Sequence, residues 1–167
     1  MTRRPEKALA LAALAACAAA LVVAEVAQHL LGFIPCDFCL LERWPYRVGM
    51  VVALLAWGSP RRPARVLLWG LVVVLLVGAG LSLTHTGVEL HWWPDPIAAC
   101  SAPDFRGMTI AQRLAAMPAR PAKSCSEPDF LIPGLPLSMT QMGLIYALAV
   151  SSCLAICLSR SKGRSFR

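Results

Sequence analysis

Four long apolar runs, separated by shorter polar segments, dominate the pattern of hydrophobic and polar positions along the chain. They cover residues 8–31, 40–57, 66–84 and 139–158. Each run is long enough to cross a hydrocarbon core of about 30 Å as a helix, and helices satisfy their own backbone hydrogen bonds in lipid. We therefore predict an all-α membrane protein, a bundle of four transmembrane helices forming a single domain over residues 1–167.

Basic residues fall at three places relative to these runs, which predicts the orientation of the bundle. They precede the first run, separate the second from the third and follow the fourth: Arg3, Arg4, Lys7, Arg61, Arg62, Arg65, Arg160, Lys162, Arg164 and Arg167. By the positive-inside rule both termini are cytoplasmic, and segments 32–39 and 87–138 face the other side. The net charge of +7 is then a topology signal, and we expect no nucleic-acid partner.

The long outer segment 87–138 carries a helical pattern in its middle. Apolar and polar positions over residues 105–117 predict a short amphipathic helix that lies on the membrane surface and covers what is beneath it. Five prolines then keep residues 119–137 extended and irregular. We expect this second part to be mobile enough to present a cysteine to a partner protein.

The seven cysteines divide into two groups. Cys17, Cys153 and Cys157 lie within apolar runs and are expected to pack as small hydrophobic residues. A lipoprotein signal ending at Cys17 is the alternative, but the apolar run continues beyond it and gives a full span. The other four cysteines lie in the two outer segments: Cys36, Cys39, Cys100 and Cys125.

Cys36 and Cys39 form a C-x-x-C pair where the second apolar run begins, which indicates thiol redox chemistry. We expect Cys39 to be the stabilised thiolate, because helix-terminal amides lie beside it and Arg43 follows one turn later. Two cysteine pairs on one side of a membrane suggest an electron relay. The alternatives are structural disulfides, a zinc ion held by all four thiolates, and an Arg43 that reaches head groups or pairs with Glu42.

Polar residues near the outer ends of the apolar runs are candidates for a ligand pocket. Glu25, Gln28 and His29 share one helix face, and His85 ends the third run. Together they are suited to hydrogen-bond the carbonyl oxygens of a lipid-soluble ligand and to carry protons. The alternative is that Glu25 pairs with His29 and that His85 caps a helix end among wet head groups.

Several motifs together resemble the DsbB family of membrane disulfide-bond formation proteins, along nearly the whole chain. The most specific is C-x-x-C-x-x-E-R, residues 36–43, in a four-span context. The supporting matches are Gln28-His29 upstream of it, His85-Thr86 at the end of the third run, an aromatic-Pro-x-Pro segment before Cys100, and Cys125 followed by Glu127.

The resemblance implies a thiol:quinone oxidoreductase of the bacterial inner membrane, with its redox cysteines in the periplasm. Its partner would be a DsbA-like thioredoxin-fold oxidase, and its cofactor a membrane quinone, ubiquinone or menaquinone. A Cys100–Cys125 disulfide would receive the partner's electrons, and Cys125 would pass them to Cys36–Cys39. Cys39 would face the quinone beside Arg43. Gln28, His29 and His85 would line the pocket, and no metal ligand is assigned.

The outer segment departs from the familiar family pattern and leaves the partner open. The stretch between His85 and Cys100 is slightly longer, and a proline-rich run follows Cys125, so a dedicated partner for a few substrates fits as well as a general oxidase. Two other classes of membrane protein are alternatives. One is a quinone-linked reductase similar to vitamin K epoxide reductase, in which the C-x-x-C usually falls late in the bundle. The other is a membrane scaffold with structural disulfides or zinc.

Overall fold

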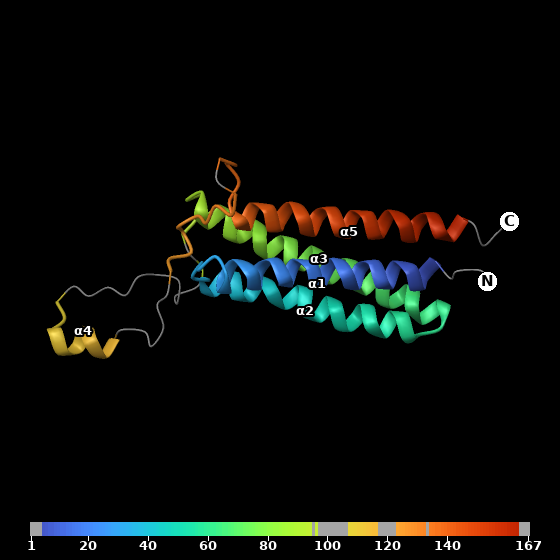
Figure 1. The fold of residues 1–167 in the computed structure, drawn as a ribbon, viewed down its shortest axis with the longest axis horizontal. Coiled ribbons are helices and arrows are strands. Elements are labelled where there is room, and N and C mark those ends of the chain that lie inside the picture. The colour runs from blue at the N-terminus through green and yellow to red at the C-terminus, as the bar shows by residue number, and fades with distance from the viewer. Residues whose placement is uncertain (1–4, 95, 97–106, 117–122, 133, 164–167) are drawn as a thin grey trace.

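The fold consists of helices joined by irregular segments (Figure 1). The computed structural model describes residues 5–94, 96, 107–116, 123–132 and 134–163. Over these residues it contains helices and no strand, so the all-α prediction is confirmed there. The helices are α1 (Pro5–His29), α2 (Asp37–Gly58), α3 (Arg61–Glu89), α4 (Ile110–Ala116) and α5 (Met139–Gly163).

Three helices are long and apolar enough to cross a membrane: α1, α3 and α5. With its 22 residues, α2 reaches roughly 33 Å at 1.5 Å per residue, which is long enough to cross a membrane. Three charged residues in its outer half, Glu42, Arg43 and Arg47, make it less apolar than the other three helices. Two of these side chains point into the bundle, since Arg43 is buried and Glu42 is partly buried. A fourth span therefore stays a prediction.

The four long helices pack side by side, and both chain ends lie together. α3 packs against α2 and α5, and α1 packs chiefly against α2. Figure 1 shows the start of α1 and the end of α5 at the same end of the bundle as the α2–α3 connection, while the α1–α2 connection lies at the opposite end. This is the arrangement that the basic residues predict. Which end faces the cytoplasm stays a prediction.

Some of the basic residues also hold this end of the bundle together. Arg61 donates to the buried carboxylate of Glu6 over 2.9 Å, which joins α3 to α1. Arg65 donates to Ser161 and to the backbone carbonyl of Leu158, which joins α3 to α5. These residues therefore have a structural role in addition to the topological one.

The short helix α4 lies away from the four long helices in Figure 1. Thr109 and Gln112 cap its start through reciprocal side-chain to backbone hydrogen bonds, as in a capping box. Its apolar side chains Ile110 and Leu114 are exposed. The expected helix is confirmed over residues 110–116 only, because residues 107–109 are not helical, and residues 105, 106 and 117 lie outside the described part. Its position on a membrane surface stays a prediction.

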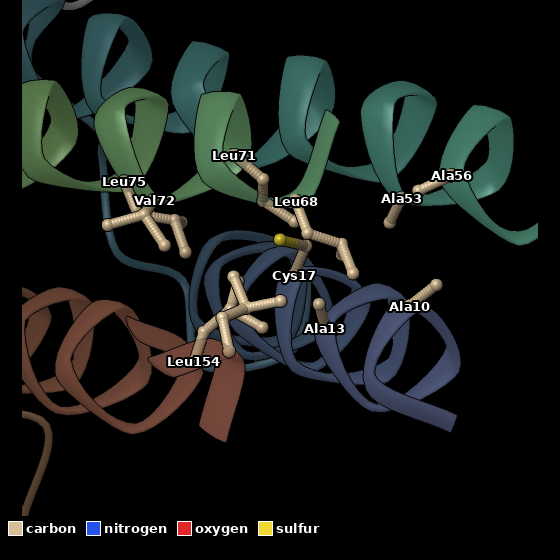
Figure 2. Packing of buried hydrophobic residues seen from close by; sticks show 11 residues of the cluster. Ala10, Ala13, Cys17, Ala53, Ala56, Leu68, Leu71, Val72, Leu75 and Leu154 are labelled. Carbon is tan, nitrogen blue, oxygen red and sulfur yellow. The ribbon is translucent and has the colours of Figure 1, made fainter. Parts of the chain in front are cut away.

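The core between the helices is built from small residues on one side and leucines on the other. Figure 2 shows alanines of α1 and α2 and Cys17 facing leucines of α3 and α5. Small side chains let membrane helices approach closely. Cys17 is fully buried within the continuous helix α1, as expected for a packing residue, whereas Cys153 on α5 is exposed.

Gly49 provides a test of this close packing. A Cβ atom at Gly49 would lie 2.9 Å from Cys17 Sγ and 3.1 Å from Leu71 Cδ1. We expect Gly49→Ala to destabilise the bundle by about 1–3 kcal/mol, as overpacked cores do, measured by unfolding in mixed micelles. Gly70→Ala is the matched control, because nothing lies within 4 Å of that position. Adding Cys17→Ala should restore the loss, and a failure to do so would contradict the proposed contact.

Candidate active site

Cys36 and Cys39 form a dithiol at the N-terminus of α2. Cys36 is the N-cap residue, and its Sγ accepts a hydrogen bond from the backbone N–H of Cys39 over 3.3 Å. The two Sγ atoms lie 3.0 Å apart, and both cysteines are free thiols. Helix N-termini offer unpaired N–H groups and a positive dipole end, both of which favour an anionic sulfur. The C-x-x-C spacing thus places one sulfur as the cap and the other in the first turn.

The geometry favours Cys36, not Cys39, as the thiolate of the reduced pair. The hydrogen bond from the Cys39 thiol is the main cause that lowers the pKa of Cys36, and the Cys39 N–H adds to it against the opposing effect of burial. The identity of the thiolate stays a prediction, but this dithiol form favours Cys36 over the expected Cys39. The reason is that Cys39 already lies inside the first turn, where its own N–H points back to the cap residue.

This assignment predicts a shifted titration for Cys36. The thiol of an ordinary cysteine has a pKa of about 8.5. Because the pKa of Cys36 is lowered, its thiolate should form at a lower pH than that in the reduced protein. The measurement is the ultraviolet thiolate absorbance of wild type minus that of Cys36→Ser. Cys39→Ala removes the donor thiol and should move the midpoint upward. An unchanged midpoint in that variant would contradict the thiol-to-thiolate hydrogen bond.

His85 of α3 lies directly beside the dithiol. Its Nε2 is 3.6 Å from Cys36 Sγ, and its Nδ1 is 2.9 Å from a carboxylate oxygen of Glu42. The ring of Phe38 stacks on the imidazole at 5.0 Å between centroids. The side chain is 2% exposed, so the alternative of a helix cap among wet head groups is wrong. The imidazole instead connects the Cys36 sulfur to the Glu42 carboxylate.

A second carboxylate, Glu89, continues this polar network and was missed by the sequence reasoning. It is buried and accepts hydrogen bonds from Ser138 over 2.6 Å and from Thr140 over 2.7 Å. The Thr140 hydroxyl is also 3.4 Å from His85 Nδ1. Glu89 follows His85 by four residues, which puts both on one helix face. That spacing is the signal that would have found it.

Arg43 is buried at the site, but its charge is already paired. Its Nη1 donates to Glu25 over 3.0 Å, and the same carboxylate contacts His29 Nε2 at 3.1 Å. The pairing of Glu25 with His29 was one of the alternatives, and it is confirmed. The pairing of Arg43 with Glu42 is not what the structure shows, because Glu42 contacts His85 instead. Arg43 thus reaches the site as half of a Glu25–Arg43 ion pair.

These side chains line a cavity of about 300 Å³ that is bounded by α1, α2, α3, α5 and residues 123–131. Four of the predicted ligand or redox residues line it together with Cys36: Cys39, Arg43, His85 and Gln28. Much of the remaining wall is apolar and comes from α1. The Gln28 Oε1 atom is buried and has no hydrogen-bond partner in the described part of the chain. His29 is not among the lining residues and is largely exposed, so we leave it out of the ligand contacts.

Cys125 packs against the dithiol although it is distant in sequence. It is fully buried in one cluster with Cys36, Phe38 and Val88, and Cys39 packs against that cluster. Cys125 is disulfide-bonded, which fits both the relay and the alternative of a structural disulfide. Cys100, its expected partner, lies outside the described residues. The structure therefore brings three of the four predicted redox cysteines to the region of the cavity.

Comparison with known proteins gives a consistent picture. The family model for disulfide bond formation protein DsbB matches residues 6–157. A disulfide bond formation protein B from Aromatoleum aromaticum is 30% identical over 92% of this chain and 94% of its own length. Those from Polaromonas sp. and Azoarcus sp. are 30% and 33% identical, over 87% and 81% of this chain and the same shares of their own lengths. No solved structure gives a significant match. With apolar helices of membrane-crossing length and clustered cysteines, the chain belongs to the DsbB family of membrane disulfide bond formation proteins.

Proposed function

We propose that the protein is a dithiol:quinone oxidoreductase of the bacterial inner membrane. It takes electrons from a periplasmic DsbA-like thioredoxin-fold oxidase and passes them to ubiquinone or menaquinone. The observation that carries this proposal is the position of the Cys36–Cys39 dithiol, which lies on the wall of a largely apolar cavity while Cys125 packs against it. One side of the dithiol is thus open to a lipid-soluble acceptor, and the other adjoins a protein disulfide.

The electrons travel by thiol–disulfide exchange, in which each new S–S bond releases one thiolate. A thiolate of the partner attacks Cys100 of a Cys100–Cys125 disulfide and releases Cys125. The partner's second thiolate then frees Cys100 and leaves the partner oxidised. Cys125 attacks Cys36 of the Cys36–Cys39 disulfide and releases Cys39, and Cys100 closes on Cys125 again. The product is the Cys36–Cys39 dithiol, the form that the structure describes.

The residues of the cavity fit a quinone. A bound quinone would accept two electrons and two protons, and it would present two carbonyl oxygens to hydrogen-bond donors. Gln28 is partly buried, and its buried Oε1 atom has no hydrogen-bond partner in the described part of the chain. Because the O and N of an amide are assigned from their contacts, this amide is available to donate to a carbonyl. Arg43 and His85 provide further N–H donors on the same wall. The volume of about 300 Å³ lies at the small end of ligand sites and suits a ring head group.

Protons must leave the dithiol as it is oxidised, and His85 is placed to take them. Its Nε2 faces Cys36, and its Nδ1 faces Glu42. The neighbouring Thr140 hydroxyl leads on to Glu89. Such a chain of hydrogen bonds moves a proton from the sulfur without exposing the site to bulk water. We assign His85 as the proton carrier and Glu42 as the residue that orients it.

The direct test is reconstitution with a quinone and a reduced thioredoxin-fold dithiol protein, following quinone absorbance. Wild type should reduce the quinone catalytically, and Cys39→Ser and Cys100→Ser should both be inactive. Cys153→Ser is the matched control, since this exposed cysteine on α5 is no part of the cavity, and it should retain full activity. If wild type reduces neither ubiquinone nor menaquinone with any dithiol protein supplied, the proposal fails.

A further inference from the structure

We propose that the reduced protein binds one thiophilic divalent cation, with Zn²⁺ as the natural candidate, through Cys36, Cys39 and His85. The ligand atoms of these three residues all lie within 4.8 Å of one another. A tetrahedral zinc ion with Zn–S bonds of about 2.3 Å and Zn–N bonds of about 2.0–2.1 Å separates its ligand atoms by roughly 3.5–3.8 Å. The observed separations of 3.0 Å between the sulfurs and 3.6 Å from Cys36 Sγ to His85 Nε2 need only small side-chain movements.

The surroundings of His85 match those of a metal-binding histidine. Metal-ligating imidazoles nearly always use their second nitrogen to contact a carboxylate, carbonyl or water, which fixes the tautomer and the ring orientation. Here the Glu42 carboxylate accepts a hydrogen bond from His85 Nδ1 over 2.9 Å, and Nε2 is directed at the sulfurs. Stacking on Phe38 holds the ring in this orientation. A proton on Nδ1 leaves the lone pair of Nε2 free for a cation.

Charge and access also favour a cation at this position. Two thiolates and one neutral imidazole give a neutral complex with Zn²⁺, and both thiol protons are released on binding. The buried positive charge nearby, Arg43, is compensated by Glu25. All three ligands line the cavity, so the fourth coordination position faces that space and is open to water. Three protein ligands with one open position is a common zinc arrangement.

The redox state of the dithiol would control this site. Forming the Cys36–Cys39 disulfide, with a small-molecule disulfide as the acceptor of two electrons and two protons, joins the two sulfurs and abolishes both thiolate ligands, so the oxidised protein has no site. A bound cation in turn holds the pair reduced and opposes its oxidation. This site differs from the four-cysteine zinc alternative because it uses a histidine and only one cysteine pair. It is argued from contacts of the dithiol and does not depend on the proposed electron acceptor.

The test uses Co²⁺ as a spectroscopic probe and Zn²⁺ as its competitor. The protein is the full chain with Cys100→Ser and Cys125→Ser, in which Cys36–Cys39 is the one dithiol left among the four outer cysteines. The reduced protein should bind one Co²⁺, with thiolate-to-cobalt charge transfer and tetrahedral d–d bands that Zn²⁺ abolishes. The oxidised protein should bind none. Cys36→Ser or Cys39→Ser should remove about half of the charge-transfer intensity. Cys153→Ser with Cys157→Ser is the control and should change nothing.

The contribution of the histidine is tested through its carboxylate partner. Glu42→Gln keeps all three ligands and should weaken the affinity for Zn²⁺ by about 10- to 100-fold, the usual effect of losing such a partner, with one ion still bound. His85→Gln should lower the affinity further and alter the d–d bands, with circular dichroism confirming that the helices remain. The proposal is overturned if the reduced protein binds no Co²⁺, if the oxidised protein binds it equally, or if neither substitution changes the affinity. Because no quinone is present, failure here is separate from failure of the proposed oxidoreductase.

Discussion

Cys125→Ser should block reduction of the quinone by a protein dithiol but leave its reduction by dithiothreitol largely intact. A protein donor meets the Cys100–Cys125 disulfide, and without Cys125 no exchange reaches the inner pair. Dithiothreitol is small enough to attack the Cys36–Cys39 disulfide itself. Cys36→Ser and Cys39→Ser should abolish turnover with both donors, because the dithiol on the cavity wall is then lost.

The measurement is quinone absorbance with each donor in turn, on the same preparations. The ratio of the two rates, not either rate alone, identifies the block, so a variant that is merely less stable loses both activities together. Cys157→Ser, on α5 and outside the cavity lining, serves as the control and should keep the wild-type ratio. Retained turnover of a protein donor by Cys125→Ser would show that the partner reduces the inner pair directly, and the relay would be wrong.

Hydropathy and charge were sufficient to predict the long helices and the ends that lie together, because lipid forces each apolar run into a helix. The helix ends were less predictable. The third run was expected to end at residue 84, whereas α3 continues to Glu89. The added turn carries His85, Val88 and Glu89, all buried by contacts with other segments. Periodicity within one run contains no information about such contacts.

The sequence predicted which side chains gather at the candidate site but not how they pair, and their redox role stays a prediction. The C-x-x-C spacing identified Cys36 and Cys39, because that spacing requires the two sulfurs to meet in the first turn of a helix. Arg43 was expected to stabilise a thiolate, yet it is paired with Glu25. Eighteen residues separate these two partners, so their contact depends on the register between α1 and α2. No local rule gives that register, and the same holds for His85 with Glu42.

The pairing of Arg43 with Glu25 changes what that arginine is able to do. A guanidinium paired with a carboxylate through one of its nitrogens contributes less net charge to a nearby sulfur, and it keeps other N–H groups for a ligand because it has five donors. Glu25 also positions the arginine from a different helix. The ion pair therefore holds Arg43 as a fixed hydrogen-bond donor on the cavity wall. The thiolate is stabilised instead by hydrogen bonds at the start of α2.

His85→Gln should lower the turnover of protein dithiol and quinone by about 10²- to 10⁴-fold, the usual contribution of a positioned proton carrier. The glutamine amide keeps hydrogen-bonding capacity toward Glu42 but cannot take up a proton from Cys36. His91→Gln is the matched control, since His91 is exposed beyond the end of α3 and does not line the cavity, and it should leave the rate unchanged.

The dependence of turnover on buffer concentration separates loss of proton transfer from a structural disturbance of the site. If His85 carries the proton, turnover of His85→Gln should become strongly dependent on buffer concentration, because small buffer acids and bases then replace the imidazole, and wild type should show no such dependence. Glu42→Gln keeps the imidazole and should lose less activity than His85→Gln. Equal losses in both variants, without rescue by buffer, would mean that the pair only holds α2 against α3. In that case the protons of the dithiol must leave by another route, through water in the cavity.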